Sequence, residues 1–139
     1  MHPVVSVVRQ TWLATTLFVL VSAGIWWKLL DWETARDHLL PTLSLSPVIW
    51  WATIGRRRPP QLLRGLGAGA LTGLLTQLTP HVPYIWPLLA GAGKGNGDGQ
   101  IMAMVALDFY LMIGAGAVMV GGLVGLIATA IDRRTQQRT

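Results

Sequence analysis

Glycine recurs every four residues in the segment that runs from Arg64 to Gly73. Residues four apart lie on one face of an α-helix, so Gly65, Gly69 and Gly73 form a single stripe. In water such a helix is poor, because each interior glycine costs about 1 kcal/mol relative to alanine. In lipid, a glycine face lets a second helix approach closely enough for dispersion forces to hold the two together.

A second segment has the same spacing of small residues. Ala117, Gly121 and Gly125 also fall four apart, and Gly114 and Gly122 lie nearby. We therefore expect two closely packed helices, which contact each other within one chain or contact a partner. These six residues are the predicted helix-packing residues: Gly65, Gly69, Gly73, Ala117, Gly121 and Gly125.

The composition favours an apolar solvent. Only 12% of the 139 residues are charged, about half the share of roughly 25% in soluble proteins, and the mean hydropathy is +0.48. The seven tryptophans fit a membrane–water interface, where this residue is enriched. The absence of cysteine excludes disulfides, thiolate metal sites and cysteine nucleophiles.

The hydropathy pattern predicts an all-α integral membrane protein with one membrane domain, residues 1–139, and four transmembrane helices. A cleaved signal peptide is the competing interpretation of the first apolar run. The run continues through Trp26 and Trp27, past a possible cleavage site at Val21 to Ala23, so a retained helix is favoured. Residues 28–38 are expected to form a mixed-charge loop, in which the spacing of Asp31, Thr34, Ala35 and His38 permits one short surface helical turn. Pro47 is expected to kink the second helix. The predicted spans are 11–30, 39–55, 62–79 and 107–131.

Residues 80–100 form the predicted outer segment, rich in proline, tryptophan and glycine. Three closely spaced prolines lead us to expect an extended chain at its start, and the glycines near Lys94 a flexible loop at its end. The apolar run from Ile101 to Ile131 is longer than a bilayer needs, so part of it should project or bend.

The arginines set the expected orientation. With four spans, eight basic residues fall on one side of the membrane and three on the other, which places both termini in the cytoplasm of a bacterial inner membrane. The arginines expected to mark this topology and to contact lipid headgroups are Arg56, Arg57, Arg58, Arg133 and Arg134.

Three polar residues are candidates for function: Asp108, His81 and Gln77. Asp108 is the one acid within an apolar run, although its expected depth near the outer headgroups favours a structural hydrogen bond. Gln77 is expected to bond to backbone or to a neighbouring helix, or to line a polar path. No spacing of ligands supports a metal site, and no phosphate loop or catalytic arrangement is present, so we expect no catalytic residue, no metal and no cofactor.

The sequence leaves three functions open. The first is a small non-catalytic subunit of a larger inner-membrane complex, which acts in helix packing, lipid contact or assembly. The second is a small homo-oligomeric transporter or flippase with a polar path near Asp108 and Gln77, and the third is an enzyme that uses His81 and Asp108 on lipid. The expected partners are membrane lipids and other membrane-protein subunits, and no nucleic acid.

Overall fold

The computed structural model describes residues 3–55, 61–91 and 97–138, and in these ranges the protein is all-helical. Two short helical turns of other types, the π-helical η1 and the 3₁₀ turn η2, follow α2 and α3. The helices are α1 (Pro3–Leu29), α2 (Trp32–Trp50), η1 (Trp51–Gly55), α3 (Leu62–Leu78), η2 (Thr79–His81), α4 (Val82–Gly91) and α5 (Gly97–Gln137).

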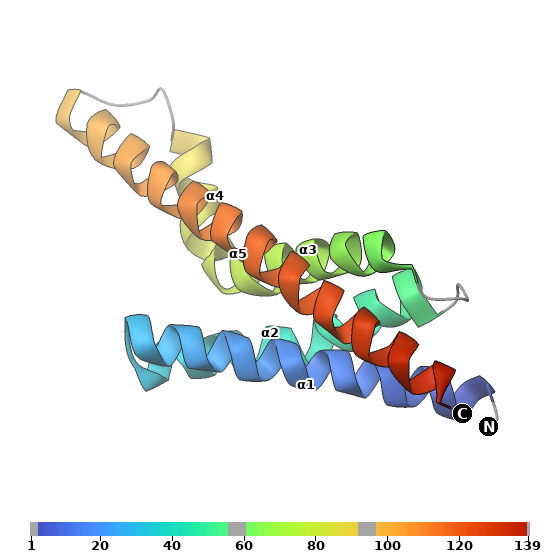
Figure 1. Cartoon of the computed structure of the whole chain (residues 1–139). Coiled ribbons are helices and arrows are strands. Elements are labelled where there is room, and N and C mark those ends of the chain that lie inside the picture. Colours follow the sequence, from blue (N-terminus) through green and yellow to red (C-terminus); the bar gives the residue numbers. More distant parts are fainter. Residues whose placement is uncertain (1–2, 56–60, 92–96, 139) are drawn as a thin grey trace.

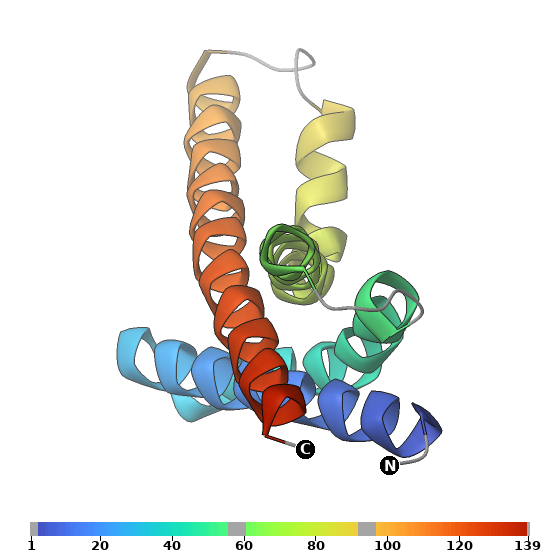
Figure 2. The same cartoon turned by 45° about the vertical axis from the view of Figure 1, so that its right-hand side comes forward.

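The helices form two layers that cross obliquely (Figure 1). The antiparallel hairpin of α1 and α2 is one layer, and α3 with α5 is the other. Figure 2 shows α4 rising beside the first half of α5, away from the hairpin. In both views the start of α1 and the end of α5 lie at the same end of the molecule.

The predicted loop at residues 28–38 is wrong, because the short helical turn allowed there is the start of a long helix. Helix α1 continues to Leu29, and α2 begins at Trp32, so only two residues connect them. The Asp31 carboxylate caps α2 by accepting a hydrogen bond of 2.7 Å from the backbone N–H of Thr34. This cap, with Glu33 in the first turn, stabilises the start of α2. The mixed charges of this segment led us to expect a loop instead.

Helix α2 and the turn η1 together cover the second predicted span and extend it toward the N-terminus. The helix keeps Pro41 and Pro47 in its interior. The π-helical turn η1 begins four residues after Pro47, and such turns interrupt the regular bonding of a helix. The continuous helix therefore runs from Trp32 to Gly55 rather than from Leu39.

The two glycine faces pack against each other within the chain, where α3 crosses α5. A Cβ atom placed on Gly69 would overlap the carbonyl oxygen of Gly121 and lie 2.7 Å from the Cα of Gly125. A Cβ on Gly73 would likewise overlap the carbonyl oxygen of Ala117. Backbone thus meets backbone along this contact, an approach that any larger side chain prevents.

The predicted extended chain after Thr79 is wrong. Residues 79–81 form η2, and α4 follows from Val82 to Gly91. Pro80 and Pro83 lie in the first turns of η2 and α4, where a backbone N–H has no helical partner to lose, and Pro87 is the one proline inside α4. The prolines therefore redirect the chain without unwinding it. Part of the predicted glycine-rich loop, residues 92–96, lies outside the described residues.

Helix α5 is a single helix of 41 residues, about 60 Å long. It contains the whole predicted span 107–131 and begins ten residues earlier, so the expected projection takes the form of a straight continuation beyond the bundle (Figure 1). Its last turns carry Arg133 and Arg134, both exposed. Arg56, Arg57 and Arg58 lie outside the described residues.

Two helices, α1 and α5, are long and apolar enough to cross a membrane. The most apolar stretch of each is mostly at the surface, with 22% of that stretch buried in α1 and 33% in α5. Helix α3 has 17 residues, and α2 carries Glu33, Arg36 and Asp37 near its start. The structure thus offers two candidate spans, and the four-span topology stays a prediction.

The interior combines a small apolar core with many polar side chains. The core lies where α1, α2, α3 and α5 meet, and the Phe18 ring contacts the Trp50 ring edge-on at 6.3 Å. Its buried apolar residues are Ala14, Phe18, Trp50, Ile54, Ala68, Val124 and Ala128. The buried polar and charged residues are Gln10, Thr15, His38, Thr42, Ser46, Thr72, Thr76, Thr129 and Asp132.

Candidate functional site

Two histidines from distant parts of the chain face each other at one end of the bundle. His38 lies in the second turn of α2, and His81 ends η2. Their Nε2 atoms are 3.1 Å apart, which is hydrogen-bonding distance. His38 is 1% exposed, whereas His81 is half-buried and reaches the surface. The pair therefore connects a buried ring to a ring that solvent can reach.

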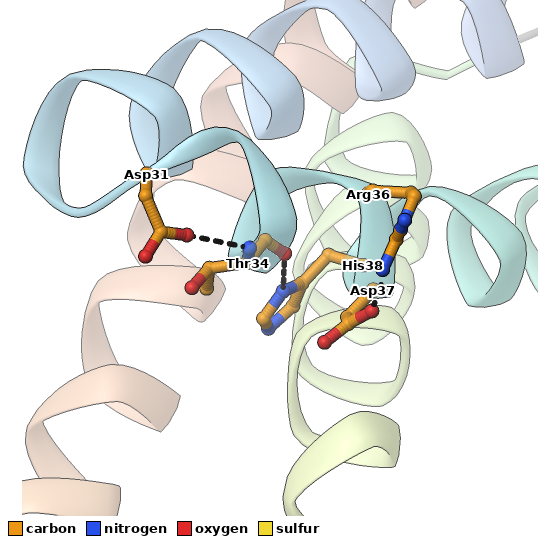
Figure 3. Close-up of polar contacts among 5 residues, drawn as sticks. All are labelled: Asp31, Thr34, Arg36, Asp37 and His38. Carbon is orange, nitrogen blue, oxygen red and sulfur yellow. Dashed lines mark hydrogen bonds and ion pairs between the residues drawn. The ribbon is translucent and has the colours of Figure 1, made fainter.

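The first turn of α2 fixes the tautomer of His38 (Figure 3). Its Nδ1 lies 2.7 Å from the backbone oxygen of Thr34, so in the neutral ring Nδ1–H donates to that oxygen. The Nε2 of His38 is then the acceptor, and the Nε2–H of His81 donates to it. The Asp31 cap holds Thr34 itself in place. Hydrogen bonds thus connect Asp31 to Thr34, Thr34 to His38, and His38 to His81.

Trp26 of α1 covers the face of His38. The two rings stack with centroids 4.2 Å apart and an interplanar angle of 20°. The indole Nε1–H of Trp26 donates to Gln77 Oε1 at 2.6 Å, and the hydroxyl of Ser22 donates to the same oxygen at 3.2 Å. The Gln77 amide nitrogen donates to the Thr76 hydroxyl at 3.1 Å. Gln77 therefore ties α1 to α3 beside the histidine pair.

Helix α5 completes the cluster with Tyr110. The ring centroid of Tyr110 lies 5.4 Å from that of His81, and the ring centroid of Trp26 lies 6.0 Å from that of His81. Helices α1, α2, α3 and α5 and the turn η2 thus all contribute to one aromatic and polar cluster. We call it the His38–His81 cluster: Ser22, Trp26, His38, Gln77, His81 and Tyr110.

Both histidines lie outside the predicted spans and both favour the neutral form. Burial lowers the pKa of His38, and the backbone oxygen of Thr34 and the carboxylate of Asp37 oppose that shift only in part. Burial also lowers the pKa of His81, and the nearby His38 lowers it further, since two positive charges repel. Protonation of both rings at the same time is therefore less favourable than protonation of one.

The structure brings together two of the three predicted polar candidates. Gln77 and His81 both belong to the cluster, where Gln77 bonds to the neighbouring helix. Asp108 is exposed on α5, and it lies two residues, or about 200° around the helix, from Tyr110. Asp108 thus points away from the face that Tyr110 turns to His81. Within the described residues, no three histidine, aspartate, glutamate or cysteine side chains gather as metal ligands.

Sequence reasoning missed His38 and Trp26. Both belong to segments that we assigned to a loop or to an interfacial belt. A signal for His38 was present: Thr42, Ser46 and Trp50 follow it at intervals of four, which is the spacing of one helical face. The prolines at positions 41 and 47 and the charges at positions 31–37 obscured that spacing.

An apolar groove lies next to the cluster, between α1, α3 and α5. Its volume is about 420 Å³, within the range of small-molecule sites. Gly73, Ala117 and Gly121 line part of it, because small residues leave space beside the helix crossing. Ser22, Trp26 and Gln77 line the groove as well, and they supply polar atoms to an otherwise apolar surface.

Comparison of the chain with protein-family models, with curated proteins and with solved structures finds no match.

Proposed function

We propose that this protein is a small integral membrane protein that crosses a bacterial inner membrane four times and serves as a non-catalytic subunit of a larger complex. The distribution of polar side chains supports the membrane location. Threonines and a serine are fully buried, whereas many large apolar side chains are exposed, among them Leu20, Leu63 and Met119. A soluble protein has the opposite arrangement, and lipid is the solvent that suits this one.

The positions of the chain ends support the proposed topology. The start of α1 and the end of α5 lie at the same end of the molecule (Figure 1), as an even number of crossings requires. Arg9 near one end and Arg133 and Arg134 near the other are exposed there. Basic residues collect on the cytoplasmic side of membrane proteins, and this rule supports the proposal that both termini are cytoplasmic.

The first half of α5 is the observation that carries the subunit proposal. A span of about 20 residues crosses the hydrocarbon core, and α5 has 41. Residues 97–106 lie before the predicted span 107–131, and of the bundle they meet chiefly α4. Met102, Met104 and Val105 in this segment are 60–71% exposed. Apolar side chains beyond the hydrocarbon core need a protein surface to cover them.

Native mass after mild-detergent extraction tests this proposal. We expect a single particle much heavier than 15.1 kDa after correction for detergent, with the same accompanying membrane proteins in each preparation. A particle that contains only this chain would contradict the proposal. Mass spectrometry of the particle identifies its components.

Two methionines provide a matched pair of variants. Met102 and Met104 lie two residues apart and therefore on different faces of α5. If a partner covers one face, Met102→Gln or Met104→Gln, but not both, should release it from the particle. Equal retention of the partner in both variants would show that this segment is not the contact.

The alternative is a small homo-oligomeric transporter or flippase. Its predicted polar path joined Asp108 to Gln77, but Asp108 is exposed and Gln77 bonds to Trp26. A proton-coupled version of this alternative requires Asp108, so unchanged transport in Asp108→Asn would eliminate it.

A further inference from the structure

The apolar groove between α1, α3 and α5 is about as long as one half of a bilayer is thick. On α1 its lining runs from Phe18 to Leu29, a separation of 11 residues, or about 16 Å along the helix axis. One leaflet of a hydrocarbon core of about 30 Å is about 15 Å thick. The deep end is lined by Phe18 and Val124, which belong to the apolar core, and the other end by Leu29 and Phe109. The groove thus has the length of a single acyl chain.

Gly116 of α5 widens the groove at its middle. The residue is exposed, and a Cβ atom added there would meet no atom within 4 Å. The volume of about 420 Å³ lies within the range of small-molecule sites. In a bilayer such a space is filled by acyl chains, because a void would forfeit the dispersion contacts of its lining.

The end of the groove near the His38–His81 cluster offers one hydrogen-bond donor. The Trp26 indole N–H can only donate, so the Gln77 amide oxygen must face it, and this fixes the orientation of the amide. One hydrogen of the Gln77 amide nitrogen goes to the Thr76 hydroxyl, and the described residues offer the second hydrogen no partner. Gln77 lies two residues before the end of the predicted span 62–79, where the hydrocarbon core meets the headgroups.

We propose that the groove binds one acyl chain of a glycerophospholipid from the leaflet opposite the chain termini, and that Gln77 Nε2–H donates to the ester carbonyl of that chain. The inference rests on the membrane location proposed above and adds a defined lipid site to it. An ester carbonyl is neutral and only accepts hydrogen bonds, so one N–H satisfies it. The carboxylate of a free fatty acid needs a cation, and no charged residue lines the groove within the described part of the chain.

Packing and the ester bond together account for retention of this lipid. An acyl chain gains no hydrophobic free energy when it leaves other acyl chains for a protein groove. A groove formed by packed helices instead supplies close contacts along the chain, and Gln77 selects the ester. The bound lipid should therefore exchange more slowly than the lipid that surrounds the bundle.

A ring placed in the groove tests the site. Gly116→Phe fills the groove, whereas Gly67→Phe adds the same ring outside it, at a position where an added Cβ also meets no atom within 4 Å. The full chain is extracted in mild detergent together with any partner and analysed by native mass spectrometry. We expect one retained phospholipid per chain in the wild type and in Gly67→Phe, and a several-fold lower occupancy in Gly116→Phe.

Two methionines of α5 give a second matched pair that leaves the glycines unchanged. Met112 and Met119 are 74% and 71% exposed and lie seven residues apart, on nearly the same helix face. Of the two, only Met112 lines the groove. Met112→Trp should therefore lower the phospholipid occupancy, and Met119→Trp should leave it unchanged.

A pair of lipids tests the role of Gln77. The extracted particle is incubated with equal amounts of dioleoyl phosphatidylethanolamine and of its ether-linked analogue, which lacks both ester carbonyls. We expect the wild type to retain several-fold more ester lipid than ether lipid, and Gln77→Leu to retain the two equally. The ratio is measured within one sample, so a change in stability alone does not alter it.

Three results would overturn the inference. Equal phospholipid occupancy in the wild type and both groove-filling variants would exclude the site, and equal retention of ester and ether lipid by the wild type would exclude the bond from Gln77. Displacement of the phospholipid by added oleic acid would assign the groove to a free fatty acid instead. Recovery of the chain in the soluble fraction without detergent would contradict the membrane location itself, whereas a lipid-bearing particle that contains only this chain would contradict the subunit proposal and support the lipid site.

Discussion

Gly69 of α3 and Gly121 of α5 lie in direct backbone contact, and each would place an added Cβ against the carbonyl oxygen of the other. The relationship is reciprocal because the two helices cross at these residues. Backbone atoms cannot rotate away as side-chain ends do, so this contact tolerates no side chain at either position.

Gly69→Ile should therefore separate α3 from α5. We expect a loss of at least about 1–3 kcal/mol in the free energy of unfolding, the usual cost of overpacking a tight interior. Thermal unfolding in detergent measures it. Gly67→Ile is the matched control, since a Cβ at Gly67 meets no atom within 4 Å. Equal stability of the two variants would show that the glycine contact does not hold the layers together.

Gln77→Leu should weaken the attachment of α1 to α3. The substitution keeps the approximate volume but leaves the Trp26 indole N–H and the Ser22 hydroxyl without their shared acceptor. An unpaired buried donor costs about 1–3 kcal/mol, so the unfolding temperature in detergent should fall. Gln100→Leu, at an exposed position of α5, controls for the change in polarity. A Gln77→Leu variant as stable as the parent would refute the role of this bond.

Stability should fall as the pH drops below the ordinary histidine pKa of about 6.5. Burial lowers the pKa values of His38 and His81 in the folded state, so the unfolded chain binds protons more readily in this range. The stabilisation is complete above the unfolded pKa and is lost as the pH falls through the lowered folded values. Unfolding followed between about pH 7.5 and 5 should show a slope that His81→Gln reduces. An identical slope in that variant would contradict this assignment.

Asp31→Ala should destabilise the start of α2, because the carboxylate accepts the backbone N–H of Thr34. The same bond lowers the pKa of Asp31, so the cap should persist until strongly acidic pH. Hydrogen exchange at the amide of Thr34 reports the loss. Asp37→Ala is the control, since Asp37 is exposed and its contact with Arg36 is long, at 4.0 Å. Unchanged exchange in Asp31→Ala would exclude the capping role.

The sequence alone determined the all-helical class, the two long apolar helices and the small-residue faces of α3 and α5. Each of these is a local property. Hydropathy is a sum over one segment, and a four-residue interval sets which residues share a helix face, so neither depends on where the rest of the chain goes. The same local rules misjudged the helix starts at Trp32 and Val82, where a capping aspartate and first-turn prolines favour helix over loop.

Only the tertiary structure decided that the two glycine faces meet within one chain, and that His38 lies against His81 and Trp26. His38 and His81 are 43 residues apart, and no spacing in the sequence relates them. The crossing of the two layers brings the start of α2 next to the end of α3. The glycine contact sets how α5 crosses α3, and this crossing places Tyr110 beside His81. The cluster therefore depends on packing between helices, which the order of residues within each helix does not specify.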